Sequence, residues 1–317
     1  MTQLFGPGDG RAAVALPALA PAGLERTELV SPRTVEEACR ALVQAESEGR
    51  KAVVLAGGTD WVVDRHLCDV TRAEPIGLVV DVTSIDELRT VEWRVEERET
   101  RLVLWGGVTY WTLRTDPRIA GALPMLGRMA ADVGAVQIQT RGTLAGNLAT
   151  ASPAADGVAA LMALDARITL AREGSSRVVP IDSFFTGYRK TVCTAAEIIT
   201  RIDVRVPPPG ALVRWQKVGT RLAQAISKVA LASAVEIEQG TVTRARFGMA
   251  SVAPITAPLA GVRAFVEGKP IASLGREALD AAVEHELHPI DDVRSTAEYR
   301  LHVAKALVRR ALTAPSA

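Results

Sequence analysis

The chain has 317 residues, of which 48% are hydrophobic and 23% charged, a composition typical of a globular protein with more than one domain. A formal net charge of +1 and an aromatic content of 4% exclude nucleic-acid binding, because neither a long-range field nor base-stacking platforms are available. Every apolar run is shorter than the roughly 18–20 residues of a membrane-spanning helix, which excludes a membrane span.

Residues 1–24 are rich in alanine, proline and glycine and predict a flexible N-terminal extension. Their apolar stretch is broken by Pro17 and Pro21, which makes it a poor signal peptide. Ordered structure is expected to follow, since Thr34 and Glu37 form the pattern of a capping box at the start of a helix.

A small α/β unit is expected over residues 25–84. The apolar strand Ala52–Leu55 runs into the glycine loop Ala56–Asp60, which leads into a helix over Trp61–Leu67. Another apolar strand follows at Leu78–Asp81. This alternation of helices and strands is typical of an α/β unit.

Residues 85–206 predict a second, larger unit. It begins with a hairpin over residues 91–97 and 102–106 and continues with helical sequence over 109–133, interrupted at Asp116-Pro117. Residues 139–156 are dense in glycine and small polar residues and predict a long loop. The remaining expected elements are a helix over 157–164 and strands over 168–171 and 198–206.

Pro207-Pro-Pro-Gly210 is the best linker in the sequence and predicts a separate domain over residues 211–317. Three strand-like runs follow the linker, over residues 213–219, 229–238 and 242–250, with a turn at Gln239-Gly240. The sequence from about Thr256 onward is helical. A sheet followed by a helical cluster indicates an α+β fold.

Cysteine and histidine are too sparse to form a metal centre. Cys39, Cys68 and Cys193 lie far apart and cannot supply the four thiolates of an iron–sulfur cluster or a structural zinc site. An odd, sparse set of cysteines favours the reducing cytoplasm. His285 and His288 share helical spacing, but without a third and fourth ligand they indicate a solvated helix face.

The glycine loop Ala56–Asp60 has the features of a phosphate-binding turn. Gly57 and Gly58 allow backbone N–H groups to converge, and Thr59 is expected to cap the following helix. By itself, however, the loop is equally typical of a tight strand–helix turn that binds nothing.

A second loop, Gly142–Asn147, again combines small residues with a hydroxyl, and two such loops can hold a pyrophosphate from both sides. Neither loop has the dinucleotide fingerprint GxGxxG or a Walker A sequence, and Gly6–Gly10 matches only superficially, without a preceding strand. A Rossmann domain is therefore not expected.

Four segments together resemble the FAD-binding flavoproteins of the molybdenum hydroxylases, of the xanthine dehydrogenase and carbon monoxide dehydrogenase type. They are residues 141–156, 184–191, 217–229 and 292–300, in consistent order within a resemblance that runs from Glu25 to Leu312. The resemblance implies a two-part FAD-binding domain of the vanillyl-alcohol oxidase and para-cresol methylhydroxylase type, followed by a small C-terminal domain.

The resemblance also implies which residues bind FAD. The pyrophosphate is expected between the two loops, on Ala56, Gly57, Gly58, Thr59, Asp60, Thr143, Leu144, Ala145, Gly146 and Asn147. Ala145 departs from the family, which usually has glycine there, and it requires a negative φ.

By the same resemblance, Asp156 bonds FAD hydroxyls, Ile226 approaches the flavin with its backbone, and Lys228 lies near the flavin ring. The alternatives are a helix cap for Asp156 and a charge at a strand edge for Lys228. Tyr188 belongs to the segment beside the flavin face where NAD reacts; the alternative is a buried tyrosine that fixes the loop.

Function follows from the resemblance as an expectation. The chain would be the FAD subunit that passes electrons from iron–sulfur clusters to an acceptor, with NAD favoured. A large subunit with the molybdenum cofactor and a small subunit with [2Fe-2S] clusters are the expected partners, in a dimer of heterotrimers. The substrate pocket would lie on the large subunit, and purines, nicotinate-like heterocycles, aldehydes and carbon monoxide are all compatible substrates.

Two other functions are open on the sequence. A free-standing FAD oxidase of the same fold would need its own base or a covalent flavin link, for which His66 and Cys68 are available after the first loop. A non-redox FAD-binding assembly scaffold would need no tuned flavin environment, so the two intact loops, Asp156 and Lys228 disfavour it.

Overall fold

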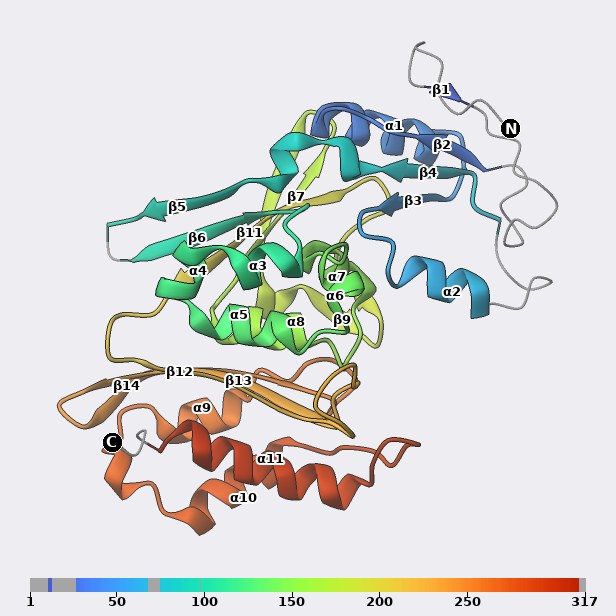
Figure 1. The fold of residues 1–317 in the computed structure, drawn as a ribbon. Helices are drawn as coiled ribbons and strands as arrows, with labels where there is room; N and C mark the ends of the chain where they lie inside the picture. The colour runs from blue at the N-terminus through green and yellow to red at the C-terminus, as the bar shows by residue number, and fades with distance from the viewer. Residues whose placement is uncertain (1–10, 13–26, 68–74, 98, 314–317) are drawn as a thin grey trace.

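The computed structural model describes residues 11–12, 27–67, 75–97 and 99–313. Two N-terminal units and a C-terminal unit are stacked on one another, with the sheet of the C-terminal unit between two sets of helices (Figure 1). The predicted α+β class with antiparallel C-terminal sheet and helices is confirmed. Within the described ranges no helix is both long and apolar enough to cross a membrane.

The first unit is built on a sheet in the order β1-β2-β4-β3, in which β2, β4 and β3 are parallel. Helix α1 begins at Val35, where the Thr34 side chain accepts a hydrogen bond from Glu37 N, as the capping pattern predicts. The bounds are β1 Arg11–Ala12, β2 Glu28–Val30, α1 Val35–Ser47, β3 Ala52–Leu55, α2 Trp61–Leu67 and β4 Leu78–Asp81. Of the predicted extension 1–24, the structure describes Arg11 and Ala12, which pair with β2.

The second unit contains an antiparallel sheet in the order β5-β6-β11-β7-β8. Its strands are β5 Val91–Val95, β6 Thr100–Trp105, β7 Arg167–Arg172, β8 Ser175–Pro180 and β11 Ile198–Val206, with a separate hairpin of β9 Phe185–Gly187 and β10 Lys190–Thr191. Its helices are α3 Tyr110–Thr115, α4 Pro117–Ala122, α5 Pro124–Ala131, α6 Val136–Gln139, α7 Leu144–Thr150 and α8 Asp156–Ala163.

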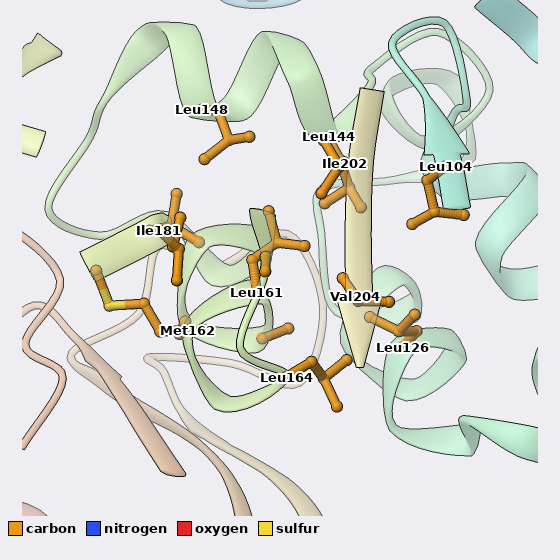
Figure 2. Packing of buried hydrophobic residues seen from close by; sticks show 14 of the residues in the cluster. Leu104, Leu126, Leu144, Leu148, Leu161, Met162, Leu164, Ile181, Ile202 and Val204 are labelled. Carbon is orange, nitrogen blue, oxygen red and sulfur yellow. The ribbon is translucent and has the colours of Figure 1, made fainter. Parts of the chain in front are cut away.

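Residues 139–156 differ from the predicted continuous loop. Helix α7 forms within them, because Thr143 caps it by accepting a hydrogen bond from Gly146 N and because Leu144 and Leu148 are buried in the core. Figure 2 shows these two leucines pointing toward Leu161 of α8 and Ile202 of β11. Tertiary burial thus makes a helix of a segment whose glycines and small residues favour a loop.

The C-terminal unit consists of an antiparallel sheet in the order β12-β13-β14, followed by helices. The turn at Gln239-Gly240 forms as predicted, with both residues at positive φ. The bounds are β12 Leu212–Val218, β13 Val229–Glu238, β14 Thr241–Ala250, α9 Ala260–Val266, α10 Arg276–Glu286 and α11 Ala297–Ala311.

The two faces of strand β13 bury different kinds of side chain. Ala230 and Ala232 belong to the core of the second unit, while Val229, Leu231 and Val235 pack with the C-terminal helices. Small residues on one face let helix α8 approach the sheet closely, and the period of two residues assigns alternate side chains to the two cores. Helix α8 therefore lies directly against the C-terminal sheet (Figure 1).

Candidate FAD site

The first loop, Ala56–Asp60, connects β3 to α2. Gly58 has a φ of +73°, a conformation that favours glycine. Position 57 has no room for a side chain, because a Cβ there would lie 2.1 Å from the carbonyl oxygen of Arg141, which precedes the second loop. The backbone of the first loop therefore touches the second loop, although the two are far apart in sequence.

The second loop ends in helix α7, whose N-cap is Thr143. Leu144 and Ala145 are buried within α7, so their side chains belong to the core. Ala145 has no positive φ, and the departure from the family glycine therefore introduces no backbone strain.

Polar contacts tie the two loops together. The Thr150 hydroxyl donates to the Asp60 carboxylate at 2.7 Å, and Arg141 Nε donates to the Gly57 carbonyl at 3.2 Å. The Thr59 hydroxyl lies 3.5 Å from the position that a Cβ on Gly142 would take. Exposed Asp60 and half-buried Gly57, Gly58 and Thr59 thus form one side of a joint backbone cradle.

Two buried polar atoms lie beneath the second loop, the Tyr110 hydroxyl and Asn147 Oδ1. A Cβ added to Gly157 would lie within 2.8 Å of each of these two atoms. Within the described ranges neither atom has a hydrogen-bond partner. Burial, reinforced by the carboxylates of Asp156 and Asp60, raises the pKa of the Tyr110 phenol well above its ordinary value, which keeps the phenol a donor. Glycine-lined backbone and unpaired polar groups at one place fit a large polar cofactor.

Comparison with known families assigns both parts of the chain. The family described as the FAD binding domain in molybdopterin dehydrogenase matches residues 25–209, more than half of the chain. The chain belongs to the FAD-binding flavoproteins of the molybdopterin dehydrogenases. The CO dehydrogenase flavoprotein C-terminal domain matches residues 215–314.

Curated relatives of this flavoprotein match over most of its length. The carbon monoxide dehydrogenase medium chain of Hydrogenophaga pseudoflava is 29% identical over 91% of this chain and 96% of its own. The nicotinate dehydrogenase FAD-subunit of Eubacterium barkeri is 31% identical over 68% of this chain and 70% of its own. A solved structure of the Hydrogenophaga carbon monoxide dehydrogenase, lacking the Mo-pyranopterin moiety, superposes with a TM-score of 0.81 at 27% identity, covering 90% and 96% of the two chains.

Asp156 of the flavoprotein is buried, with 8% of its surface exposed. Its carboxylate accepts from Lys217 Nζ at 2.5 Å and from the Ser227 hydroxyl at 2.6 Å. Burial raises the pKa of the carboxyl, while Lys217 and Ser227 act in the opposite direction. Its predicted alternative role, as the cap of a helix that begins at Gly157, is wrong: α8 begins at Asp156 itself, with Ala155 at the N-cap.

Ile226 and Lys228 lie in the C-terminal unit, just before β13. Ile226 is 54% exposed. Lys228 Nζ lies 5.2 Å from the centroid of the Tyr299 ring, an attractive cation–π geometry. The backbone N–H of Lys228 donates to the Val218 carbonyl at 2.8 Å, so the residue stands where a loop closes and not at a free strand edge.

Tyr188 lies at the tip of the β9–β10 hairpin and is 62% exposed. The alternative of a buried tyrosine is therefore wrong. The neighbouring Arg189 has a φ of 52° and its guanidinium lies 4.0 Å from the Asp64 carboxylate of α2, the helix after the first loop. The hairpin tip therefore lies close to α2, the helix that follows the first loop.

An ion pair fixes the chain that follows this hairpin. Arg177 donates to both oxygens of Glu197, at 2.6 and 2.8 Å, and Thr194 N donates to the same carboxylate at 2.8 Å. The hydrogen bonds from Arg177 above all lower the pKa of Glu197 from its ordinary value of 4.5 to about 2.

A depressed carboxyl pKa stabilises the fold above pH 4.5, and this contribution is lost as the pH falls toward 2. We therefore expect Glu197→Gln to lower the free energy of unfolding by about 1–2 kcal/mol at pH 7, and the difference from wild type to shrink on acidification. Urea unfolding of both proteins at pH 7 and pH 3 measures this. A difference that is unchanged at pH 3 would contradict it.

The sequence does not predict a role for Tyr110, and Lys217 and Ser227 fall within the family-like segment 217–229 without a predicted role of their own. Tyr110 is preceded by an ordinary helix cap, Thr109, and nothing local marks its hydroxyl as buried near Asp156. Cys68, suggested for a covalent flavin link, lies outside the described residues, as does the side chain of His66. His285 and His288 are both exposed, but the predicted shared helix face is wrong for His288, because α10 ends at Glu286.

Proposed function

We propose that the chain is the flavoprotein subunit of a molybdenum hydroxylase that takes electrons from [2Fe-2S] clusters and delivers them to NAD. The observation that carries the proposal is the junction of the two loops, where Gly57 touches Arg141, together with the exposed Tyr188, whose neighbour Arg189 reaches Asp64 of α2. When bound, FAD supplies the ability to collect single electrons and to release two together as a hydride.

The residues of the chain have distinct roles in this proposal. The backbone of the two loops holds the pyrophosphate, and the Asn147 amide and the Tyr110 hydroxyl lie beneath it. Asp156 contributes an acceptor to FAD hydroxyls. Lys228 places a positive charge near the flavin ring. Its electrostatic attraction stabilises the negative charge that the flavin gains on reduction. Ile226 lines the ring with its backbone, and Tyr188 stacks on the nicotinamide.

Partner chains are part of the proposal. The name of the Hydrogenophaga relative, a medium chain, implies a larger and a smaller chain beside it. We place the molybdenum cofactor on the large subunit and the [2Fe-2S] clusters on the small one, in a cytoplasmic dimer of heterotrimers. The described residues of this chain contain no group of three or more histidine, cysteine and acidic side chains that could hold a metal.

The domain division is proposed at the linker. Strand β11 ends at Val206 and β12 begins at Leu212, and the two strands belong to different sheets. We therefore divide the chain into an FAD-binding domain over residues 25–206, with subdomains 25–84 and 85–206, and a C-terminal domain over 211–317.

An anaerobic titration of the complex tests the acceptor. We expect a flavin spectrum near one FAD per chain that NADH bleaches. If dithionite bleaches the flavin and NADH does not, the acceptor is a quinone or another compound and not NAD. Rapid oxidation of an alcohol or sugar by the chain alone would favour a free-standing oxidase, and a bound flavin that dithionite fails to reduce would favour a scaffold.

Removing the Tyr188 ring separates nicotinamide binding from flavin binding. Because the ring is exposed and its loss creates no cavity, we expect Tyr188→Ala to keep its FAD and its stability. Bleaching by NADH should slow about fivefold, since an aromatic stack contributes roughly 1 kcal/mol. Stopped-flow spectra with NADH and with dithionite measure both effects, and Tyr188→Phe is the matched control. An unchanged NADH rate in Tyr188→Ala would contradict the role.

A further inference from the structure

The C-terminal domain presents a loop over residues 219–226 whose two stems meet at one side chain of the FAD domain. Lys217 lies near the end of β12, and Ser227 lies two residues before β13. Both side chains bond the Asp156 carboxylate, Lys217 through Oδ2 at 2.5 Å and Ser227 through Oδ1 at 2.6 Å. One buried carboxylate thus bridges the two ends of the loop.

Backbone and hydroxyl contacts close the same stem. Lys228 N donates to the Val218 carbonyl, and the Ser251 hydroxyl donates to the Ser227 carbonyl, each at 2.8 Å. Ser251 N in turn donates to the Pro153 carbonyl at 2.8 Å, three residues before Asp156. The start of α8 is therefore attached to the stem by side chain and by backbone.

Beyond the stem the loop depends on its own contacts. The Arg221 guanidinium donates to the carbonyls of Ala223 and Gln224, both within the loop, and Leu222 is 98% exposed. The position of Ile226 relative to the FAD domain is therefore set by the stem of the loop, at Lys217 and Ser227.

The ion pair between Lys217 and Asp156 contributes little net free energy to the stability of the fold. Both side chains are about nine-tenths buried, and removing two charges from water cancels much of their attraction. Lys217 Nζ also donates to the Asp132 carbonyl at 2.8 Å, so its geometry is fixed on two sides. A buried pair of this kind defines one arrangement of the groups it joins, because any other arrangement leaves a buried charge unpaired.

We propose that Asp156, in addition to its contact with FAD hydroxyls, has a positioning role: through Lys217 and Ser227 it sets the loop over residues 219–226 in register with the two FAD loops, and thereby places Ile226 and Lys228 against the flavin. The proposal rests on the proposed function, because it concerns how the chain holds its own FAD. It assigns roles to Lys217 and Ser227, which lie in the C-terminal domain and not in either glycine loop.

Ser227→Ala tests the proposal with the smallest change, since it removes one hydroxyl and leaves the ion pair. In the full complex we expect FAD affinity to fall about tenfold or more, the loss associated with one hydrogen bond to a charged group. The visible circular dichroism of the bound flavin and its midpoint potential should change as well, because Ile226 and Lys228 shift relative to the ring.

The matched control is Glu236→Gln. Glu236 accepts from Arg205 NH2 at 3.2 Å, a part-buried ion pair that also joins the two domains but lies toward the other end of β13. The control should lower the melting temperature and leave the flavin dichroism and potential unchanged. A merely structural role for Ser227 would give the same pattern as the control.

The outcomes separate the two proposals. If wild type binds FAD and Ser227→Ala has wild-type affinity, dichroism and potential, the positioning role is overturned. If wild type binds FAD but neither dithionite nor NADH bleaches it, the proposed function fails, whereas the affinity and dichroism of Ser227→Ala still test the positioning. Asp156→Asn should change the FAD affinity, the flavin dichroism and the midpoint potential more than Ser227→Ala does. If Asp156→Asn does not fold, the results for Ser227→Ala decide the question.

Discussion

Gly57→Ala is expected to weaken FAD binding severely. A Cβ at this position would lie 2.1 Å from the Arg141 carbonyl oxygen and 2.6 Å from its carbon, and both are backbone atoms that cannot rotate away. The two loops must separate to admit the methyl group, which destroys the cradle between them. We expect the dissociation constant of FAD to rise about 100-fold or more, the equivalent of nearly 3 kcal/mol. Equilibrium titration of the apoprotein with FAD measures it.

Gly121→Ala is the matched control for this substitution. Gly121 lies in α4, a Cβ there would meet no atom within 4 Å, and its φ is not positive. We expect wild-type FAD affinity and a slight gain in stability, since alanine favours a helix over glycine by up to about 1 kcal/mol. Wild-type affinity in Gly57→Ala would show that the loops are not in contact as described.

Gly248→Ala is expected to cause a large loss of stability, at the junction of the two domains. A Cβ on Gly248 in β14 would lie 2.2 Å from the carbonyl oxygen of Ala159 and 2.9 Å from its Cα, both in α8. Neither a strand nor a helix can yield without shifting the sheet away from the FAD domain. We expect the free energy of unfolding to fall by about 3 kcal/mol, as in severe overpacking. Urea unfolding followed by tryptophan fluorescence measures the loss.

Gly187→Ala provides the comparison for a strand glycine without crowding. Gly187 lies in β9, its φ is not positive, and no atom lies within 4 Å of its would-be Cβ. Its stability should remain within about 0.5 kcal/mol of wild type. Equal losses in the two variants would mean that the substitution acts through strand propensity and not through the contact with α8.

Local chemistry explains where the sequence predicted structure well and where it did not. The cap at Thr34, the apolar run of β3 and the turn at Gln239-Gly240 are each specified by a few neighbouring residues, and each forms as predicted. Strand β8 was missed because the side chains of residues 175–178 are exposed and show no apolar alternation; its pairing with β7 holds it in place.

The sequence by itself determined most of the elements, the family and the two glycine loops, because cofactor-binding loops need particular residues at particular spacings. Only the tertiary structure decided that Gly57 touches Arg141 and that Asp156 is shared by Lys217 and Ser227. Such contacts join residues far apart in the chain, and no local pattern records them. Whether a buried carboxylate is stable depends on the charges that packing brings beside it, and that arrangement exists only in the folded protein.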